Sequence, residues 1–281
     1  MPELPEVETI ARGVQERVAG DRIVAVWLNR VPQTWKTPRG EQARGLAGRG
    51  ILGVHRTGKH IVCELGRAAD SPHKAQWIVH LGMSGRLLVT TPEGEVHAHT
   101  HARLQLASGR ELRFVDPRRF GRLEFRRIVP GSGKSSEIEF KAPGLDPLQV
   151  SEAEFRALFQ GRKLAIKAAL LNQRLLAGVG NIYADESLFA AGIRPTMRAG
   201  RIPPQRLERL RVALQGVLLH AIELGGSSVS DYVDADGVKG FFQLEHCVYQ
   251  RTGEPCRRCG KPIKRIELAG RGTHYCPTCQ N

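Results

Sequence analysis

Apolar residues near the start of the chain recur at helical spacing. Residues 5–18 read PEVETIARGVQERV, and the apolar positions lie three or four residues apart at Val7, Ile10, Val14 and Val18. Pro5 suits a first helical turn. The pattern predicts an amphipathic helix over residues 5–18.

Between residues 21 and 128 the pattern changes to short runs rich in β-branched and aromatic residues. The runs are IVAVWL, GILGVHR, HIVCEL, QWIVHLG, RLLV, ARLQLA, ELRFV and GRLEFRRI. Clusters of glycine, proline and serine separate them. About eight short strands at this spacing predict an antiparallel β-sandwich or barrel.

Helical periodicity returns after PGSGKSSE at residues 130–137, which is typical of a linker. Ser151 and Glu154 form a capping-box pattern before a short helix. GRKLAIKAALLNQRLL and NIYADESLFAAG predict two helices separated by AGVG, and residues 203–224 predict another. GGSSVSDYVDADGVKG then predicts a loop. We expect an α+β multidomain chain: residues 1–130 a β-sandwich with an N-terminal helix, 131–145 a linker, 146–246 a helical domain, and 247–281 a small cysteine-bearing domain.

Four of the six cysteines form two pairs in the last segment. Cys256 and Cys259 are followed, after sixteen intervening residues, by Cys276 and Cys279. This spacing predicts one structural zinc ion bound by four thiolates, which would supply the folding energy that so short a segment lacks. Two disulfides or a redox pair are the alternatives.

The charge balance favours a polyanionic partner. The 42 Lys and Arg outnumber the 28 Asp and Glu, for a net charge of +14. Nucleic acid is the partner that this excess indicates, although basic proteins also bind anionic membranes. The sequence has no apolar stretch of 18 residues and no secretory pattern, so we expect a soluble, cytoplasmic protein without a membrane partner. Nothing in it indicates a nucleotide cofactor, and we take a monomer as the default.

The N-terminal residues Pro2 and Glu3 carry candidate chemistry. Removal of Met1 would leave Pro2 with a secondary amine, and an α-amino group with a pKa near 8 is partly unprotonated at neutral pH. Attack of that amine on a sugar C1′ gives an iminium, which favours β-elimination, and Glu3 is adjacent as an acid or base. The alternative is that Pro2 has no catalytic role, as in most proteins with proline at this position.

Arg271 lies between glycines in AGRGT, which indicates the tip of a hairpin between the two cysteine pairs. A guanidinium there could reach a phosphate, or it could be a solvated turn residue.

PELPEVET at the start, LGMSGRL, FVDPRRFGRLE, GVGNIYADESLF and the final RGTHYCPTCQ together resemble the bacterial formamidopyrimidine-DNA glycosylase family over the whole chain. The resemblance implies a bifunctional enzyme that excises oxidised purines such as 8-oxoguanine from damaged double-stranded DNA and nicks the abasic site by β,δ-elimination. It also implies a helix–two-turn–helix element in the helical domain and DNA in the cleft between the domains. By position, Pro2 corresponds to the Schiff-base nucleophile, Glu3 to the general acid/base, Lys59 to a proton-transfer lysine, and Arg271 to the zinc-finger arginine that assists δ-elimination.

The same resemblance implies DNA contacts. Met83, Arg118 and Phe120 correspond to side chains that fill the helix when a nucleotide is turned out of it. The remaining candidates for DNA binding are His99, Arg162, Lys167 and Asn181. The loop GGSSVSDYVDADGVKG corresponds to a mobile segment that closes over the everted base. ELGRAADSPHKAQW departs from the family pattern and is expected to lengthen a hairpin.

Two other readings stay open. An endonuclease VIII-like enzyme would act on oxidised pyrimidines, but Leu4 and the Arg118–Phe120 pair favour the purine enzyme. A zinc protein that only binds damaged DNA would have no need of Pro2 and Glu3.

Overall fold

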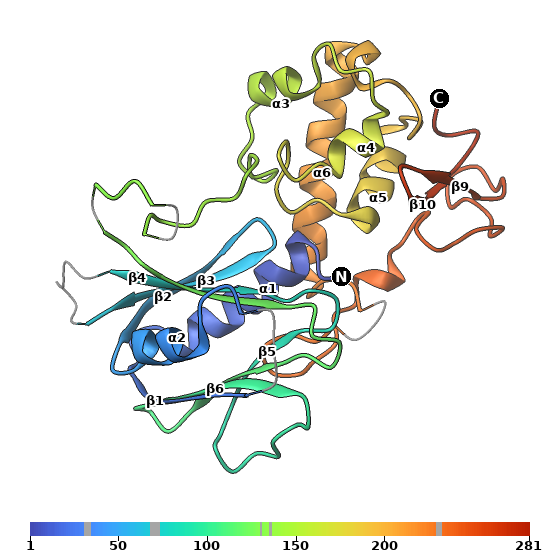
Figure 1. Cartoon of the computed structure of the whole chain (residues 1–281). Coiled ribbons are helices and arrows are strands. Elements are labelled where there is room, and N and C mark those ends of the chain that lie inside the picture. Colours follow the sequence, from blue (N-terminus) through green and yellow to red (C-terminus); the bar gives the residue numbers. More distant parts are fainter. Residues whose placement is uncertain (31–34, 68–73, 130, 135–136, 229–231) are drawn as a thin grey trace. The chain divides into compact units, whose positions relative to one another are not determined.

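The computed structural model describes residues 1–30, 35–67, 74–129, 131–134, 137–228 and 232–281 (Figure 1). The chain divides into two compact units: unit 1 is Met1–Lys141 with Ser227–Gly240, and unit 2 is Ala142–Gly226 with Phe241–Asn281. The chain therefore leaves unit 2 after Gly226, contributes a segment to unit 1, and returns. The boundaries expected after residues 130, 145 and 246 stay predictions.

Unit 1 contains two four-stranded antiparallel sheets, which confirms the predicted sandwich of eight strands. The strands are β1 (Ile23–Leu28), β2 (Gly50–Thr57), β3 (His60–Gly66), β4 (Ala75–His80), β5 (Arg86–Thr90), β6 (Thr100–Leu106), β7 (Glu111–Val115) and β8 (Arg122–Arg127). One sheet has the order β1-β6-β7-β5 and the other the order β2-β3-β4-β8. Their apolar faces share one core.

Helix α1 (Leu4–Val18) confirms the predicted N-terminal helix. Its apolar stripe is fully buried in the shared core, because Val7, Ile10 and Val14 all point to the same side. The helix packs mainly on β2, so the start of the chain is tied to the centre of unit 1.

Helix α2 (Arg39–Leu46) was not expected from the sequence. Its sequence, RGEQARGL, has no apolar stripe, and Gln42 and Leu46 are its buried residues. The indole Nε1 of buried Trp77 donates to the Gln42 side-chain oxygen at 2.8 Å. A tertiary hydrogen bond thus supports a helix that local periodicity does not predict.

The segment Ser227–Gly240 is loop-like, as predicted, and its described part packs on unit 1. Tyr232 and Ala235 belong to the unit 1 core, and the Val89 N–H donates to the Ala235 carbonyl at 3.0 Å. Residues 229–231 lie outside the described residues. Closure of this loop over a base stays a prediction.

Unit 2 is helical with a terminal hairpin. It contains α3 (Glu152–Phe159), α4 (Ile166–Leu170), α5 (Asn181–Ala191), α6 (Pro204–Glu223), the 3₁₀ turns Ala199–Arg201 and Phe242–Leu244, and the strands β9 (Lys264–Leu268) and β10 (Arg271–Tyr275). The Ser151–Glu154 capping box is present, with the Ser151 N–H donating to the Glu154 carboxylate at 2.9 Å. Helix α6 confirms the helix predicted over residues 203–224.

The helix predicted over residues 161–176 is wrong except for the five residues of α4. Beyond it, the Gln173 amide donates to the carbonyls of Leu171 and Val179, at 2.9 and 2.8 Å, and accepts from the Gly178 N–H. The amide side chain satisfies backbone groups of the turn, so the chain bends towards α5.

No helix in the described part of the chain is long and apolar enough to cross a membrane. The expected hairpin extension includes residues 68–73, and the expected linker includes residues 130, 135 and 136; these lie outside the described residues.

Two histidines face each other across β3 and β4 in unit 1. His60 is paired with His80, and their ring centroids are 4.8 Å apart. Burial, the His80 ring and Lys36 lower the pKa of His60 to about 3. Burial and the nearby charges of Lys59 and Arg122 lower the pKa of His80 to about 4. Both rings are therefore neutral at physiological pH.

We predict that unit 1 loses stability in mild acid because of this pair. Between pH 6.5 and about 4 the unfolded chain binds protons that the folded rings do not. The stability present above pH 6.5 is therefore lost as the pH falls, by up to ~1.4 kcal/mol per pH unit for each histidine. Urea unfolding followed by tryptophan fluorescence measures this, since all three tryptophans lie in unit 1.

His60→Gln should reduce the pH dependence of the free energy of unfolding. His97→Gln, at an exposed position of unit 1, should leave this dependence unchanged. Equal slopes for His60→Gln and the parent protein would contradict the assignment.

Candidate functional site

The N-terminal residues are held in place rather than frayed. Pro2 is buried and Glu3 is 5% exposed. The Glu3 N–H donates to the carboxylate of buried Glu6 at 2.8 Å, across the first turn of α1. The other Glu6 oxygen accepts the Ser227 N–H at 2.8 Å. The candidate nucleophile and its neighbouring carboxyl group are therefore positioned by α1.

Lys59 lies in the tight turn between β2 and β3, where Thr57 pairs with His60. Gly58 in this turn has a φ of 61°, which favours glycine. Lys59 is 9% exposed, so the turn keeps its side chain close to the protein surface instead of extending it into solvent. Its charge contributes to the lowered pKa of His80.

One buried carboxylate joins the two loops that carry the candidate wedge residues. The Asp116 oxygens accept the Ser84 hydroxyl at 2.7 Å and the Gly121 N–H at 2.8 Å. Ser84 in turn accepts the Arg118 N–H at 3.2 Å. The loops pack so closely that a Cβ on Gly82 would lie 2.5 Å from the Phe120 carbonyl carbon. Asp116 therefore brings residues 82–85 and 117–121 side by side.

The wedge candidates are exposed on these loops. Met83 is 41% exposed and Phe120 is 48% exposed, high values for apolar side chains. The Arg118 guanidinium lies 4.7 Å from the centre of the Phe120 ring. The structure thus brings Met83, Arg118 and Phe120 together on anchored loops.

His99 is exposed in the turn before β6, and its carbonyl accepts the Asp116 N–H at 3.0 Å. His101, two residues on, is buried, with its Nε2 3.0 Å from the Asp116 carbonyl oxygen. The two histidines therefore differ in exposure, and the buried one belongs to the same anchor as the wedge loops.

In unit 2 the structure brings Asn181 and Arg271 together. Arg271 follows a two-residue turn in which Ala269 and Gly270 have φ values of 51° and 68°, which is typical of a type I′ hairpin. Its side chain is exposed, as the sequence predicts for a hairpin tip. Asn181, the first residue of α5, donates its side-chain amide to the carbonyl of Gly272 at 2.9 Å.

The other two candidates for phosphate binding in unit 2 differ in exposure. Arg162 is exposed in the turn after α3, where its side chain donates to the Leu158 carbonyl and stays accessible to a phosphate. The sequence predicts a DNA contact for Lys167, but its side chain is not exposed in the structure. Its side chain is fully buried and its Nζ lies 2.7 Å from Asp185 Oδ1. A buried ammonium ion that is already paired has no access to a phosphate.

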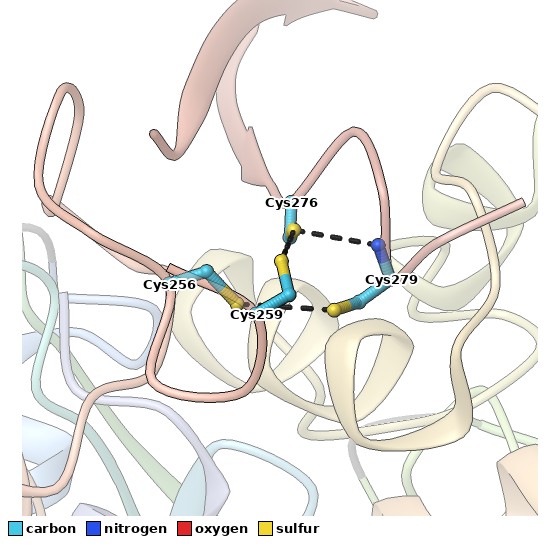
Figure 2. A group of neighbouring side chains, drawn as sticks. All are labelled: Cys256, Cys259, Cys276 and Cys279. Carbon is cyan, nitrogen blue, oxygen red and sulfur yellow. Dashed lines mark hydrogen bonds between the residues drawn. The ribbon is translucent and has the colours of Figure 1, made fainter. Parts of the chain in front are cut away.

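The four predicted ligand cysteines converge at one point (Figure 2). Their sulfur atoms all lie within 4.8 Å of one another, and Cys256–Cys279 and Cys259–Cys276 are 3.9 and 3.5 Å apart. Tetrahedral zinc with Zn–S bonds of about 2.3 Å sets sulfurs about 3.8 Å apart, so the cluster fits this ion. All four cysteines are free, which argues against the disulfide alternative.

The cysteine cluster is docked on the C-terminal end of α5. Cys256 and Cys276 share a small core with Phe189. Arg258 donates to the Phe189 carbonyl at 3.1 Å and lies 4.3 Å from the centre of its ring. Arg258, one of the basic residues of this segment, therefore binds a carbonyl group at the C-terminal end of α5 instead of a ligand.

Sequence reasoning missed the buried carboxylates that hold these elements. They include Glu6 and Asp116 in unit 1, and Asp185 and Glu186 of α5 in unit 2. Glu186 accepts the N–H groups of Cys247, Val248 and Tyr249 at 2.8–2.9 Å, where the chain enters the cysteine-bearing segment. A signal was present, since DES occurs within an otherwise apolar helix, NIYADESLFAA.

Three family models match consecutive parts of the chain. Residues 1–123 match the formamidopyrimidine-DNA glycosylase N-terminal domain, residues 144–233 its H2TH domain, and residues 253–281 a zinc finger found in FPG and IleRS. A formamidopyrimidine-DNA glycosylase from Solibacter usitatus is 44% identical over 100% of this chain and 99% of its own length. The chain belongs to the formamidopyrimidine-DNA glycosylase family.

Solved structures agree with this family. MutM (Fpg) from Thermus thermophilus has a TM-score of 0.83 and 41% identity, covering 99% of this chain and 98% of its own. Lactococcus lactis Fpg in complex with DNA containing an abasic site has a TM-score of 0.84 and 32% identity, with 99% of both chains covered. The zinc-finger match and the geometry together identify the cysteine cluster as a site for one zinc ion.

We predict that Asp116→Asn loosens both wedge loops. Asparagine keeps one acceptor oxygen but places an NH₂ group where the second carboxylate oxygen accepts a hydrogen bond, so unit 1 should lose ~1–3 kcal/mol of stability in urea unfolding. Amide hydrogen exchange should rise at residues 118–121. Ser84→Ala, which removes one contact, should have a smaller effect, and the exposed Glu93→Gln none. Unchanged exchange in Asp116→Asn would refute the anchoring role.

We predict that zinc binding requires Cys259 but not Cys247. The purified chain should contain one zinc ion, which Cys259→Ser should largely lose, because a hydroxyl replaces one of four thiolates. Cys247→Ser is the matched control, since Cys247 lies outside the cluster. A colorimetric zinc assay after thiol release measures the stoichiometry. Zinc retained by Cys259→Ser, or lost equally from both variants, would contradict the ligand set.

Proposed function

We propose that this chain is a bifunctional DNA glycosylase and abasic-site lyase that excises oxidised purines, including formamidopyrimidines and 8-oxoguanine, from duplex DNA in base excision repair. Membership of the formamidopyrimidine-DNA glycosylase family supports the glycosylase activity. The complex of the Lactococcus lactis relative with DNA containing an abasic site supports damaged DNA as the partner. We place the activity in the bacterial cytoplasm, where the chromosome lies.

The observation that carries the mechanism is the fixed position of Pro2 and Glu3 at the start of α1. A nucleophile that is held in an attacking geometry reacts much faster than one that must first be ordered. The Glu3–Glu6 hydrogen bond supplies that order to a chain end that would otherwise fray. Met1 is exposed, so it is accessible to removal, which would leave Pro2 with a free secondary amine.

The proposed first step is base release. The Pro2 nitrogen forms a bond to C1′ while the glycosidic bond breaks, and the base leaves with that electron pair and takes a proton from solvent. Glu3 accepts the amine proton and returns it to O4′ as the C1′–O4′ bond breaks. The product is a ring-opened iminium on Pro2, which withdraws electrons from C2′.

The proposed second step is strand cleavage. Loss of a C2′ proton expels the 3′-side phosphate by β-elimination, and loss of a C4′ proton then expels the 5′-side phosphate by δ-elimination. We assign proton transfer in these steps to Lys59, and stabilisation of a departing phosphate to Arg271. Water hydrolyses the remaining iminium and frees the Pro2 amine.

We assign the binding of duplex DNA to residues in both units. Met83, Arg118 and Phe120 would fill the space left by the everted nucleotide, which offsets the cost of unstacking it. Asn181, Arg162 and His99 would contact phosphates. The exposure of Met83 and Phe120 supports the first assignment, and the exposure of Arg162 and His99 the second.

We predict that borohydride traps a covalent adduct between Pro2 and a duplex containing one 8-oxoguanine:cytosine pair. Mass mapping should place the adduct on the N-terminal peptide of the protein without Met1. A variant with alanine inserted before Pro2 should give no adduct, because its only α-amine is displaced by one residue. If the parent protein binds DNA tightly but forms no adduct, the result would favour the alternative of a protein that only binds damaged DNA.

The role of the Glu3 carboxyl group is tested by measuring base release from the same duplex. Glu3→Gln should lower base excision by ~10²–10⁴-fold, as expected for loss of a general acid/base. Glu16→Gln, on the exposed side of α1, is the matched control and should retain full activity. A preference for oxidised pyrimidines over 8-oxoguanine would favour the endonuclease VIII-like reading.

A further inference from the structure

Lys167 and Asp185 form a buried ion pair that the proposed reaction does not use. Both side chains are fully buried, and Lys167 Nζ lies 2.7 Å from Asp185 Oδ1, between α4 and α5. Removing two charges from water is costly, and replacing such a pair with apolar residues is often neutral or stabilising. The pair therefore calls for a role other than stability.

The pair binds three consecutive residues of β10. Lys167 Nζ donates to the Gly272 carbonyl at 3.0 Å and to Thr273 Oγ1 at 2.8 Å. Asp185 Oδ2 accepts the His274 N–H at 2.9 Å. Residues 272–274 directly follow Arg271, so these three contacts lie within three residues of the exposed guanidinium.

Thr273 passes this constraint to Arg271 itself. The Thr273 hydroxyl donates to the Arg271 carbonyl at 3.2 Å. An ammonium group has donors only, so Thr273 must accept from Lys167, and its single proton remains for Arg271. The buried charge thus sets the direction of the hydroxyl, and the hydroxyl holds the Arg271 backbone.

The same strand is tied to the start of α5. The Gly272 carbonyl accepts from Lys167 and also from the Asn181 amide at 2.9 Å. The backbone next to Arg271 is therefore bound directly by Asn181, the other candidate phosphate ligand of unit 2. Without these contacts, the hairpin tip would be held by the β9–β10 ladder and its two-residue turn.

We propose that Lys167, Asp185 and Thr273 are positioning residues that fix the Arg271 guanidinium for the δ-elimination step. This inference rests on the proposed function, in which Arg271 meets the departing phosphate. It assigns no chemical step to the three residues. They act through Arg271, and their loss should change which elimination product accumulates more than it changes Schiff-base formation at Pro2.

The main test is Thr273→Val, which removes the hydroxyl but keeps the side-chain shape and the buried ion pair. The zinc-loaded, full-length chain without Met1 is incubated with a 5′-labelled duplex containing one abasic site. Gel electrophoresis separates the β-product, which ends in an unsaturated aldehyde, from the δ-product, which ends in a phosphate. We expect the ratio of δ- to β-product to fall about fivefold, comparable to the loss of one hydrogen bond.

Asp185→Asn is the second variant. It removes the charge that holds Lys167, and the ratio should fall about tenfold or more, because small misplacements of an acting group have large effects on rate. The matched control is Thr252→Val, at an exposed threonine of the same unit, for which the ratio should equal that of the parent. Zinc content and borohydride trapping are measured on every variant.

A double-mutant cycle tests whether Thr273 acts through Arg271. Adding Thr273→Val to Arg271→Ala should lower the ratio no further than Arg271→Ala alone. A further fivefold fall in that background would overturn the proposal. An unchanged ratio in Thr273→Val and Asp185→Asn would also overturn it, whatever their zinc content and trapping, because the pair would then at most stabilise the fold.

Failure of the proposed function gives a different result. The parent chain would then neither form a trapped adduct nor nick the abasic duplex, whatever residue stands at position 273. A parent that traps and nicks, with variants that differ only in product ratio, supports both conclusions.

Discussion

A hydrogen bond across the first turn of α1 holds the N-terminal residues of this chain in place. The carboxylate of Glu6 accepts the Glu3 N–H through one oxygen and the Ser227 N–H through the other, both at 2.8 Å. Chain ends are ordinarily the least ordered part of a domain. Here α1 is buried in the sandwich core, so Pro2 and Glu3 gain the order of that core. The proposed amine chemistry depends on this constraint.

The elements predicted from the sequence are those that bury a regular apolar face. Strands β1–β8 and helices α1 and α6 have such faces, and their periodicity is visible without a structure. Helix α2 has none, because its support is the side-chain contact of Gln42 with Trp77. The turn after α4 was missed for a related reason, since Gln173 satisfies its backbone through contacts that no periodic pattern encodes.

Spacing predicted the candidate site where it defines the chemistry, as for the four cysteines, which converge in the structure. The roles of Pro2 and Glu3 come from the family resemblance and stay predictions. The sequence did not predict the site where burial decides the role. Lys167 has the charged side chain expected of a phosphate ligand, yet the fold buries it beside Asp185 inside unit 2. Asp116 likewise resembles a solvated loop residue in sequence, and its function as the anchor of two loops emerges only when Ser84 and Gly121 are brought to it.

The return of the chain into unit 1 at Ser227–Gly240 affects how such a protein can evolve. A gene truncated after residue 141 would encode both sheets but lack Tyr232 and Ala235, which belong to their core. A gene for the remainder would carry those two residues without the sheets that bury them. Neither unit is thus encoded by one continuous stretch of the gene that recombination could exchange. The two units must therefore evolve together within one gene.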